Sequence, residues 1–203
     1  MTGPGIRAVR IAAWAMVLLL AAVVGWSLIT NRGADPQAAL APASIGGPFE
    51  LTDQTGATVT EAALKGHPSA LFFGYTYCPD VCPTTLFEAT NWLKALGPDG
   101  DKLKFYFVSV DPERDTREQL ASYLEAFDPR ITGLTGSQAA VDRIAEAYRV
   151  YVNKVDYGDG NYLVDHTASV YLLDDTGEFV ATIAYEEDPE IVLAKLRRLV
   201  GTS

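Results

Sequence analysis

The sequence contains two cysteines, Cys78 and Cys82, which lie four positions apart. Residues at this spacing come onto one face of a helical turn with Cα atoms about 6 Å apart, so the two sulfurs can form a disulfide or hold a metal ion. Pro83 suits a first helical position, and Thr85 with Glu88 matches a capping box. We therefore predict that both thiols lie at a helix N-terminus, where the helix dipole lowers the pKa of a thiol and favours the thiolate.

Two alternatives assign no chemistry to this pair. One is a disulfide that only stabilises the fold, but a bridge closing so short a loop removes little entropy from the unfolded chain. The other is two buried, reduced cysteines, which the neighbouring Pro79, Asp80 and Thr84 argue against. The sequence therefore favours redox exchange or metal binding, both of which use the thiolate.

A third ligand for a metal would come from one of the two histidines. His67 lies in a turn before an apolar run, and we expect it at the surface, away from the cysteines. His166 directly precedes a different apolar run. Two thiolates and one imidazole make a three-coordinate site that suits Cu(I), since soft ligands select Cu(I), zinc or iron–sulfur clusters. The alternative for His166 is a strand-end histidine hydrogen-bonded to Asp165.

The residue counts limit the other metal sites. With two cysteines and two histidines, four-cysteine clusters, multi-zinc modules and disulfide-dense scaffolds are excluded. A structural zinc would need all four of these residues to converge.

Apolar periodicity and turn residues predict the elements that position these side chains. Strands are expected at 69–75, 104–110 and 131–135. Helices are expected at 86–96, at 117–127 with Thr116 as its cap, at 138–148 with Ser137 as its cap, and after Asp188-Pro189. Hairpins are expected at 49–60, 150–164 and 168–184.

Parallel strands joined by helices, then closed by a hairpin and a last helix, predict an α/β sandwich with a mixed central sheet flanked by helices. This arrangement is thioredoxin-like, with an extra leading hairpin and an inserted hairpin. In that fold the segment entering the strand after His166 lies against the turn that carries the cysteines. Redox members have a cis-proline in this segment, whereas this chain has a histidine.

The N-terminal segment differs from the rest of the chain. Ile11–Ile29 holds nineteen uncharged residues, which as a helix span about 28 Å, enough to cross a bilayer. Arg7 and Arg10 precede this run, which predicts a cytoplasmic N-terminus and an external domain. We expect a membrane anchor at 1–30, a flexible linker at 31–47 and a thioredoxin-like domain at 48–203; a cleaved signal peptide is the alternative.

The charged residues are unevenly distributed. All 26 acidic residues follow residue 34, together with 13 of the 16 basic ones, and the net charge is −10. An acidic domain without basic clusters argues against nucleic-acid binding, which needs cations against phosphate.

Three segments resemble the SCO/SenC family of membrane-anchored copper chaperones for cytochrome c oxidase. They are FFGYTYCPDVCPTT, VSVDPERDT and YLVDHTASVYLLDDTGEF, at 72–85, 108–116 and 162–179. The resemblance implies that Cys78, Cys82 and His166 bind copper, as Cu(I) or Cu(II). It also implies delivery to the CuA site of oxidase subunit II, a redox-active Cys78–Cys82 disulfide, and a periplasmic thiol reductant or copper donor as a further partner.

The short N-terminus leaves no room for a transit peptide, so we expect a bacterial inner-membrane protein with its domain in the periplasm. It would be a metallochaperone rather than an enzyme. The alternatives are a thiol–disulfide reductase or peroxidase of the same fold, and a copper or redox sensor. A redox Cys-x-x-Cys motif has two intervening residues rather than three, which disfavours the reductase.

Two further segments surround the predicted site. Asp80 could tune the thiol pKa or contact the copper acceptor, or it could simply cap the helix. Residues 150–164 are expected to be a mobile element that positions His166. Residues 111–116 are predicted to be a turn and a helix cap, without a role in the site.

Overall fold

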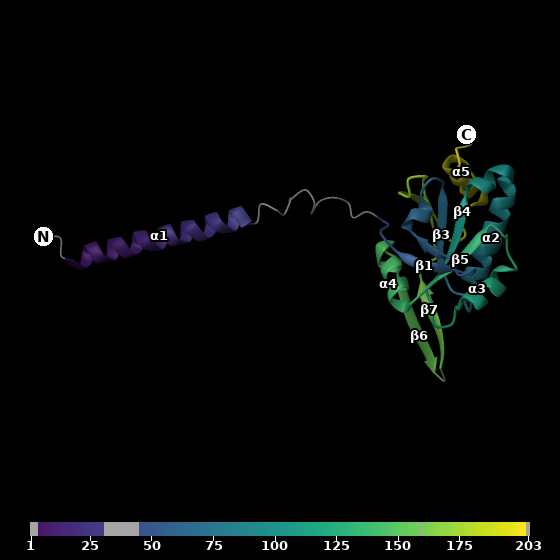
Figure 1. Ribbon diagram of the computed structural model, residues 1–203, viewed down its shortest axis with the longest axis horizontal. Coiled ribbons are helices and arrows are strands. Elements are labelled where there is room, and N and C mark those ends of the chain that lie inside the picture. The colour runs from purple at the N-terminus through teal and green to yellow at the C-terminus, as the bar shows by residue number, and fades with distance from the viewer. Residues whose placement is uncertain (1–3, 31–44, 159, 202–203) are drawn as a thin grey trace. The chain divides into compact units, whose positions relative to one another are not determined.

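The computed structural model describes residues 4–30, 45–158 and 160–201 (Figure 1). By its contacts the chain divides into two units, Met1–Ser44 and Ile45–Ser203. The first unit contains α1 (Pro4–Thr30), in which Val9–Ser27 is long and apolar enough to cross a membrane. A signal sequence near an N-terminus would have the same properties.

The second unit is built on a seven-stranded sheet in the order β2-β1-β5-β4-β3-β8-β9. Its strands are β1 (Glu50–Asp53), β2 (Thr58–Thr60), β3 (Ser69–Gly74), β4 (Lys104–Ser109), β5 (Ile131–Thr135), β8 (Val170–Leu173) and β9 (Phe179–Ile183). β3, β4 and β5 run parallel, and the outer strands pair antiparallel. This is the predicted mixed sheet with its leading hairpin.

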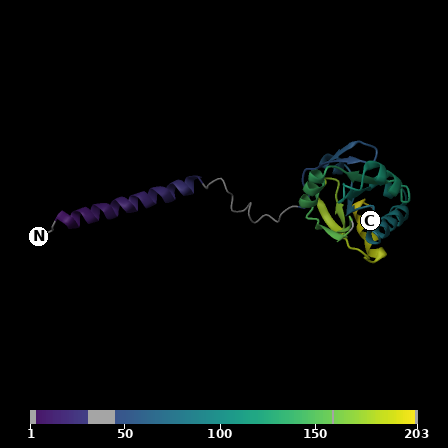
Figure 2. The ribbon, with the colours of Figure 1, turned by 90° about the horizontal axis from the view of Figure 1, so that it is seen from below.

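Helices cover both faces of this sheet. They are α2 (Val81–Ala95), α3 (Arg117–Leu124), α4 (Gln138–Ala147) and α5 (Pro189–Leu199), with short 3-10 helices η2 (Glu61–Leu64) and η3 (Gly97–Lys102). In Figures 1 and 2, α4 lies on one side of the domain, and α2 and α3 lie on the other. Right-handed crossovers from β3 to β4 and from β4 to β5 place α2 and α3 on the same face.

Alternate residues of the central strand β3 serve the two faces. Phe72 contacts Phe107, with ring centroids 6.0 Å apart, and Phe107 contacts Tyr123 of α3. Phe73 points the other way and contacts Tyr148, which follows α4, at 5.8 Å. Every residue of β3 is buried, as a strand covered on both faces requires.

The helix caps were predicted in part. Thr116 accepts a hydrogen bond from the Gln119 amide at 3.2 Å, Ser137 caps α4, and Asp188 caps α5, all as expected. The Thr85 and Glu88 capping box is wrong, because α2 begins four residues earlier, at Val81. Thr85 lies inside the helix with a buried hydroxyl for which the described residues provide no hydrogen-bond partner.

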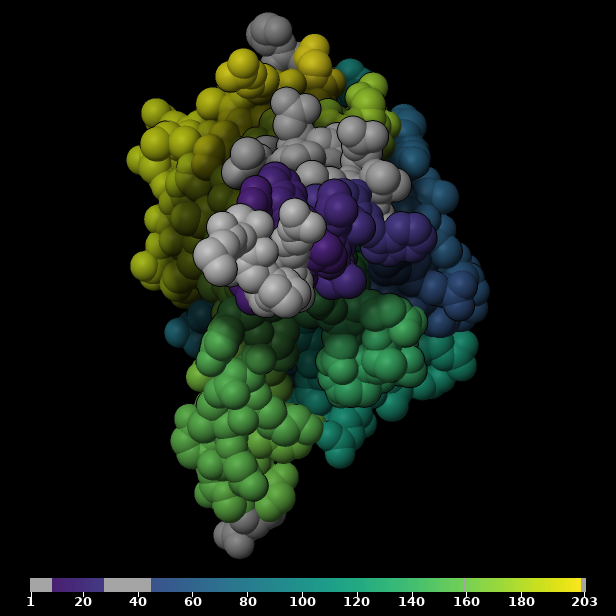
Figure 3. Space-filling model, turned by 90° about the vertical axis from the view of Figure 1, so that its left-hand side faces the viewer, coloured from purple at the N-terminus to yellow at the C-terminus, as the bar shows by residue number. Residues whose placement is uncertain are grey.

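A second, two-stranded sheet carries the histidine. β6 (Val152–Gly158) pairs antiparallel with β7 (Asn161–His166), with Val152 opposite His166. This hairpin projects from the body of the domain (Figure 3). At its base, Thr167 donates its amide to the Tyr151 carbonyl, and Tyr151 donates its amide to the Thr167 hydroxyl. The inserted hairpin is therefore confirmed, and His166 is the last residue of its second strand.

Candidate metal centre

Cys78 lies in the loop between β3 and α2, and its sulfur caps that helix. The Cys82 amide, in the first turn of α2, donates to Cys78 Sγ at 3.4 Å. Asp80 occupies the N-cap position, but its side chain makes no capping hydrogen bond. Sulfur therefore accepts the hydrogen bond that an oxygen side chain accepts at an ordinary N-cap. This substitution explains why the helix begins earlier than the sequence pattern predicts.

The hydrogen bonds around Cys78 stabilise its thiolate. The hydrogen bond with the Cys82 side chain lowers the pKa of Cys78 most. Burial opposes this effect, but the contact with the His166 side chain and the hydrogen bonds from the amides of Asp80 and Cys82 lower the pKa further, to about 4. Cys78 is half-buried. The predicted thiolate is confirmed for this cysteine, because a thiol with such a pKa is ionised at neutral pH.

Cys82 is different, and the prediction of two lowered pKa values is wrong for it. Its side chain is 0% exposed, and burial raises its pKa well above the ordinary value. The neighbouring Cys78 also raises this pKa, because two thiolates in contact repel each other. The pair therefore consists of an accessible thiolate above a buried thiol, and both cysteines are free in this structure.

His166 approaches the sulfurs from β7. Its Nε2 lies 3.4 Å from Cys82 Sγ, and its Nδ1 lies 3.0 Å from the Thr167 carbonyl oxygen. A carbonyl only accepts hydrogen bonds, so Nδ1 carries the proton and Nε2 directs its lone pair at the sulfurs. The ring edges of Phe72 and Tyr75 hold the imidazole at centroid distances of 6.2 and 5.9 Å.

These three side chains form one candidate ligand set. The two sulfurs and one imidazole nitrogen all lie within 4.8 Å of one another. Three donors placed trigonally at metal–sulfur distances of about 2.3 Å would be about 4 Å apart, so the set needs little movement to close on an ion. Two soft sulfurs and a nitrogen suit Cu(I). No other such group occurs in the parts of the chain that the structure describes.

The set is open to solvent on one side. A pocket of about 410 Å³ is lined by Tyr75, Cys78, Pro79, Asp80, Val81, Leu163, Val164, Asp165 and His166. Cys78 and His166 line this pocket, whereas Cys82 lies behind them. A ligand from another molecule can therefore approach from the pocket.

The structure places the other candidates apart from this ligand set. His67 Nδ1 contacts Ser69 Oγ at 3.3 Å, beside the start of β3, whereas the cysteines follow its end. The expectation that His67 lies away from the cysteines is confirmed. Asp80 is exposed beside the pocket. It occupies the N-cap position, but its side chain makes no capping hydrogen bond. A favourable interaction with the helix dipole, tuning of Cys78 and contact with a partner all stay predictions for it.

The comparisons with known proteins agree with this geometry. A family model described as SCO1/SenC matches residues 37–201. The chain belongs to the SCO1/SenC family. SCO2, a mitochondrial protein of Saccharomyces cerevisiae, is 39% identical over 176 residues, which cover 85% of this chain and 58% of the relative. SenC of Rhodobacter capsulatus is 39% identical over 152 residues, which cover 75% of this chain and 69% of the relative.

A solved structure of a relative shows the same fold. The structure of Bradyrhizobium japonicum ScoI with copper bound is 51% identical and covers 77% of this chain and 99% of that one, with a TM-score of 0.73. The predicted thioredoxin-like fold is thereby confirmed. This SCO1/SenC chain spans little more than half the length of the yeast relative, at 58%.

Two features of this SCO1/SenC site were missed from the sequence. The first is Gly74, the last residue of β3, where an added Cβ would lie 2.7 Å from Cys82 Sγ and 2.7 Å from the Phe107 ring. A glycine is required there so that the buried thiol can approach the sheet. A glycine directly after the apolar run 69–73 was the available signal.

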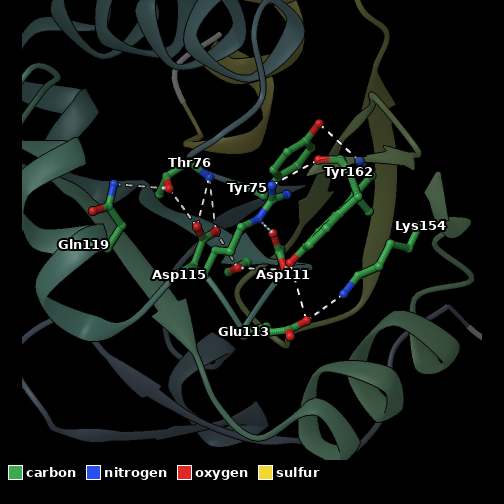
Figure 4. Close-up of polar contacts among 11 residues, drawn as sticks. Tyr75, Thr76, Asp111, Glu113, Asp115, Gln119, Lys154 and Tyr162 are labelled. Atoms are coloured by element: carbon green, nitrogen blue, oxygen red, sulfur yellow. Dashed lines mark hydrogen bonds and ion pairs between the residues drawn. The ribbon is translucent and has the colours of Figure 1, made fainter. Parts of the chain in front are cut away.

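The second is the polar cluster at 111–116, whose sequence predicts only a turn and a helix cap (Figure 4). Asp115 is fully buried and accepts hydrogen bonds from the Thr76 amide and hydroxyl and from the Ser109 hydroxyl. It thereby fixes the loop that leads into Cys78. Burial raises the pKa of Asp115. The same cluster reaches the histidine hairpin, since the Tyr162 hydroxyl donates to Asp111 at 2.8 Å.

Proposed function

We propose that this chain is a membrane-anchored copper metallochaperone that binds copper through Cys78, Cys82 and His166 and delivers it to the CuA site of cytochrome c oxidase subunit II. The observation that carries the proposal is the convergence of two sulfurs and an imidazole nitrogen within 4.8 Å, although they come from elements far apart in the sequence. A relative that is 51% identical is described as having copper bound. Copper is cargo in this scheme.

The donor set also explains how loading would be controlled. Cys78 and Cys82 bind copper only as thiols or thiolates, because a disulfide leaves neither sulfur able to act as a thiolate ligand. Oxidation of the pair therefore prevents loading, and a thiol reductant restores it. A copper donor and a periplasmic thiol reductant are accordingly proposed partners.

Release is favoured by the same geometry. A three-coordinate ion leaves room for a thiolate of the acceptor to enter from the pocket beside Cys78 and His166. The acceptor can then displace one ligand at a time, so that copper is never free in solution. Asp80, exposed at this pocket, is proposed to contact the acceptor.

We propose that residues 1–30 anchor the chain in a bacterial inner membrane, that 31–47 form a linker, and that 48–203 form the copper-binding domain outside the cytoplasm. An uncharged helix and arginines before it support this topology. Labelling of single cysteines placed at the two ends of the chain, in intact cells, tests it. A C-terminal cysteine that reacts with an impermeant maleimide supports the topology, and one protected from the reagent contradicts it.

A second candidate function is thiol–disulfide exchange on the cysteines of the CuA site. The pairing of an accessible thiolate at Cys78, whose pKa is about 4, with a buried thiol at Cys82 favours it. In such exchange the Cys78 thiolate attacks a disulfide of the partner, and Cys82 then resolves the mixed disulfide. The partner disulfide gains two electrons and the Cys78–Cys82 pair loses them.

One experiment separates the two functions. The copper-loaded full chain in detergent is mixed with a CuA domain that is copper-free and already reduced, and the absorption spectrum is recorded. Formation of the CuA spectrum once a one-electron oxidant has been added supports delivery, because the spectrum arises from a mixed-valence copper pair. In a second mixture the CuA domain is oxidised and the chain is reduced. If the chain reduces this domain but copper is not transferred in the first mixture, thiol exchange is the function. His166→Ala is the matched variant, since it keeps both thiols and lacks the third ligand.

A further inference from the structure

The position of His166 depends on a hairpin that is not part of the main sheet. β6 and β7 pair only with each other, and the side chains of β6 are mostly exposed. Within β7, Val164 is buried and Tyr162 packs partly against the core. Contacts that the side chains of β7 make with the rest of the domain therefore fix the distance between His166 and the cysteines.

Arg114 makes the most extensive of these contacts. Its Nε donates to the carboxylate of Asp111, and one terminal nitrogen donates to the Tyr162 carbonyl oxygen at 3.0 Å. Its guanidinium also lies over the Tyr162 ring, 3.6 Å from the centroid. The Tyr162 hydroxyl donates to Asp111 in turn (Figure 4). Arg114, Asp111 and Tyr162 therefore form a closed ring of contacts.

The same guanidinium reaches the cysteine loop. It lies 4.9 Å from the ring centroid of Tyr77 and 5.6 Å from that of Tyr75, and Tyr77 directly precedes Cys78. Tyr75 touches the histidine side as well, because its hydroxyl accepts the Val164 amide at 3.2 Å and its ring edge meets His166. One arginine side chain thus contacts the residues next to one ligand and the strand that carries another.

We propose that Arg114 is a positioning residue that holds the histidine strand against the cysteine loop and so sets the geometry of the ligand set. It does not touch the proposed metal position; it acts through Tyr162 and the tyrosines beside Cys78. This inference rests on the proposed copper site. Asp111 has a buried carboxylate, and its ion pair with the Arg114 Nε holds the arginine in place.

The shape of the arginine side chain matters as well as its charge. A guanidinium donates in two directions from one rigid plane while it stacks on aromatic rings. A lysine ammonium at the same place reaches either Asp111 or the Tyr162 carbonyl oxygen, and it has no planar face for the tyrosines. Arg114→Lys therefore keeps the charge and removes the bridge.

The test uses the full chain in detergent with two variants, Arg114→Lys and Arg114→Met. Cu(I) affinity is measured anaerobically by competition with a chelator, and the Cu(II) form is examined by electron paramagnetic resonance. We expect Cu(I) affinity to fall about tenfold or more, as for other residues that orient a metal ligand. We also expect altered copper hyperfine splitting, because the distance between His166 and the two cysteine sulfurs is no longer fixed.

Arg130 provides a matched control. Its Nε and one terminal nitrogen bind Asp128, another terminal nitrogen binds Asp101, and its side chain is 28% exposed against 23% for Arg114. It packs elsewhere in the domain. Arg130→Lys and Arg130→Met report what the loss of an arginine–aspartate pair costs in stability alone, and we expect both to keep wild-type copper affinity and spectra.

A measurement without copper keeps this inference separate from the proposed function. In the metal-free protein, magnetisation transfer between the His166 and Tyr75 rings and slow exchange of the Val164 amide report on the hairpin. We expect both signals to weaken in the Arg114 variants and to persist in the Arg130 variants. If wild type binds no copper, the proposed function fails and these signals alone decide the role of Arg114.

The outcome that overturns the inference is a pair of Arg114 variants that melt earlier, as the Arg130 variants do, yet retain wild-type copper affinity, spectra and ring contacts. Should Arg114→Met fail to fold, Arg114→Lys decides by the same criteria. Should both fail, Tyr162→Phe, which keeps the stacked ring but lacks the hydroxyl bonded to Asp111, is measured in their place.

Discussion

The Nε2 atom of His166 lies 3.4 Å from the Sγ atom of Cys82, although the two residues are 84 positions apart in the chain. Two separate features of the fold bring them together. Cys82 is held in the first turn of α2 against the central strand, and His166 ends the strand β7 of the projecting hairpin. The Thr167 carbonyl oxygen binds Nδ1 and so directs the free nitrogen at the sulfurs.

Replacement of His166 tests the three-ligand site directly. We expect His166→Ala to bind Cu(I) at least about a hundredfold more weakly, because a ligand contributes more than the surrounding groups, whose loss already costs 10- to 100-fold. Anaerobic competition titration measures this. His67→Ala is the control, since His67 lies beside the other end of β3 and should leave the affinity unchanged. Equal affinity of His166→Ala and wild type would show that the histidine is not a ligand.

Much of the fold was predictable because its signals are local. The continuous apolar run of β3 and the caps at Thr116, Ser137 and Asp188 depend on residues a few positions apart, and the structure confirms them. The start of α2 was not predictable in this way, because the group that caps it is a sulfur, Cys78 Sγ. Sequence rules for N-caps describe oxygen side chains.

The convergence of the candidate ligands was predictable from the sequence, and their electrostatics were not. Cysteine spacing and the thioredoxin-like order of elements point to Cys78, Cys82 and His166. The raised pKa of Cys82 comes from complete burial of its side chain between α2 and the central sheet, which depends on Gly74 and on tertiary packing. Likewise, the contacts of Arg114 join residues 48 positions apart, and no local pattern reports such a distance.

The unequal pKa values of the two thiols predict how many protons copper displaces. Cys78, with a pKa of about 4, is already ionised at pH 7, whereas Cys82 is protonated because its pKa is raised. Binding of one Cu(I) should therefore release about one proton from the thiols at pH 7, the proton that Cys82 carries. Calorimetric titration in buffers of different ionisation enthalpy measures this number at pH 7.

Alkylation provides the copper-free control for the same prediction. The rate of reaction of Cys78 with iodoacetamide should stay nearly constant from pH 8 to pH 5 and fall only near its pKa of about 4. Cys82 should stay unmodified in the folded chain. Release of two protons at pH 7, or a reaction rate that falls already between pH 9 and pH 7, would show that Cys78 is an ordinary thiol.

Gly74→Ala should damage the site more than the fold. The added methyl group meets Cys82 Sγ and the Phe107 ring, both at 2.7 Å. We expect a loss of about 1–3 kcal/mol in the free energy of unfolding, as for other overpacked cores, together with weaker copper binding because Cys82 must shift. Urea unfolding and the competition titration measure the two effects.

Gly133→Ala is the matched control for this variant. Gly133 lies on β5 of the same sheet, where an added Cβ meets Leu124 Cδ1, also at 2.7 Å, and no cysteine. It should lower stability by no more than Gly74→Ala does, because the end of a leucine side chain can shift, and it should leave copper affinity unchanged. If Gly74→Ala binds copper as tightly as Gly133→Ala and wild type do, Gly74 serves packing alone.

Asp80→Asn tests whether the exposed acid beside Cys78 contacts the copper acceptor. Its carboxylate makes no capping hydrogen bond and is exposed, so its loss should change stability by less than about 0.5 kcal/mol. Cu(I) affinity should also stay close to wild type, because Asp80 binds Cys78 through its backbone amide, which the variant keeps.

Transfer of copper from Asp80→Asn to the CuA domain, followed by stopped-flow absorption, should become slower and less sensitive to salt, since a charge at the contact is lost. Asp175→Asn, at an exposed turn between β8 and β9, should leave the transfer rate unchanged. Equal transfer by both variants would exclude Asp80 from the contact, and a marked loss of stability in Asp80→Asn would assign it to the helix terminus instead.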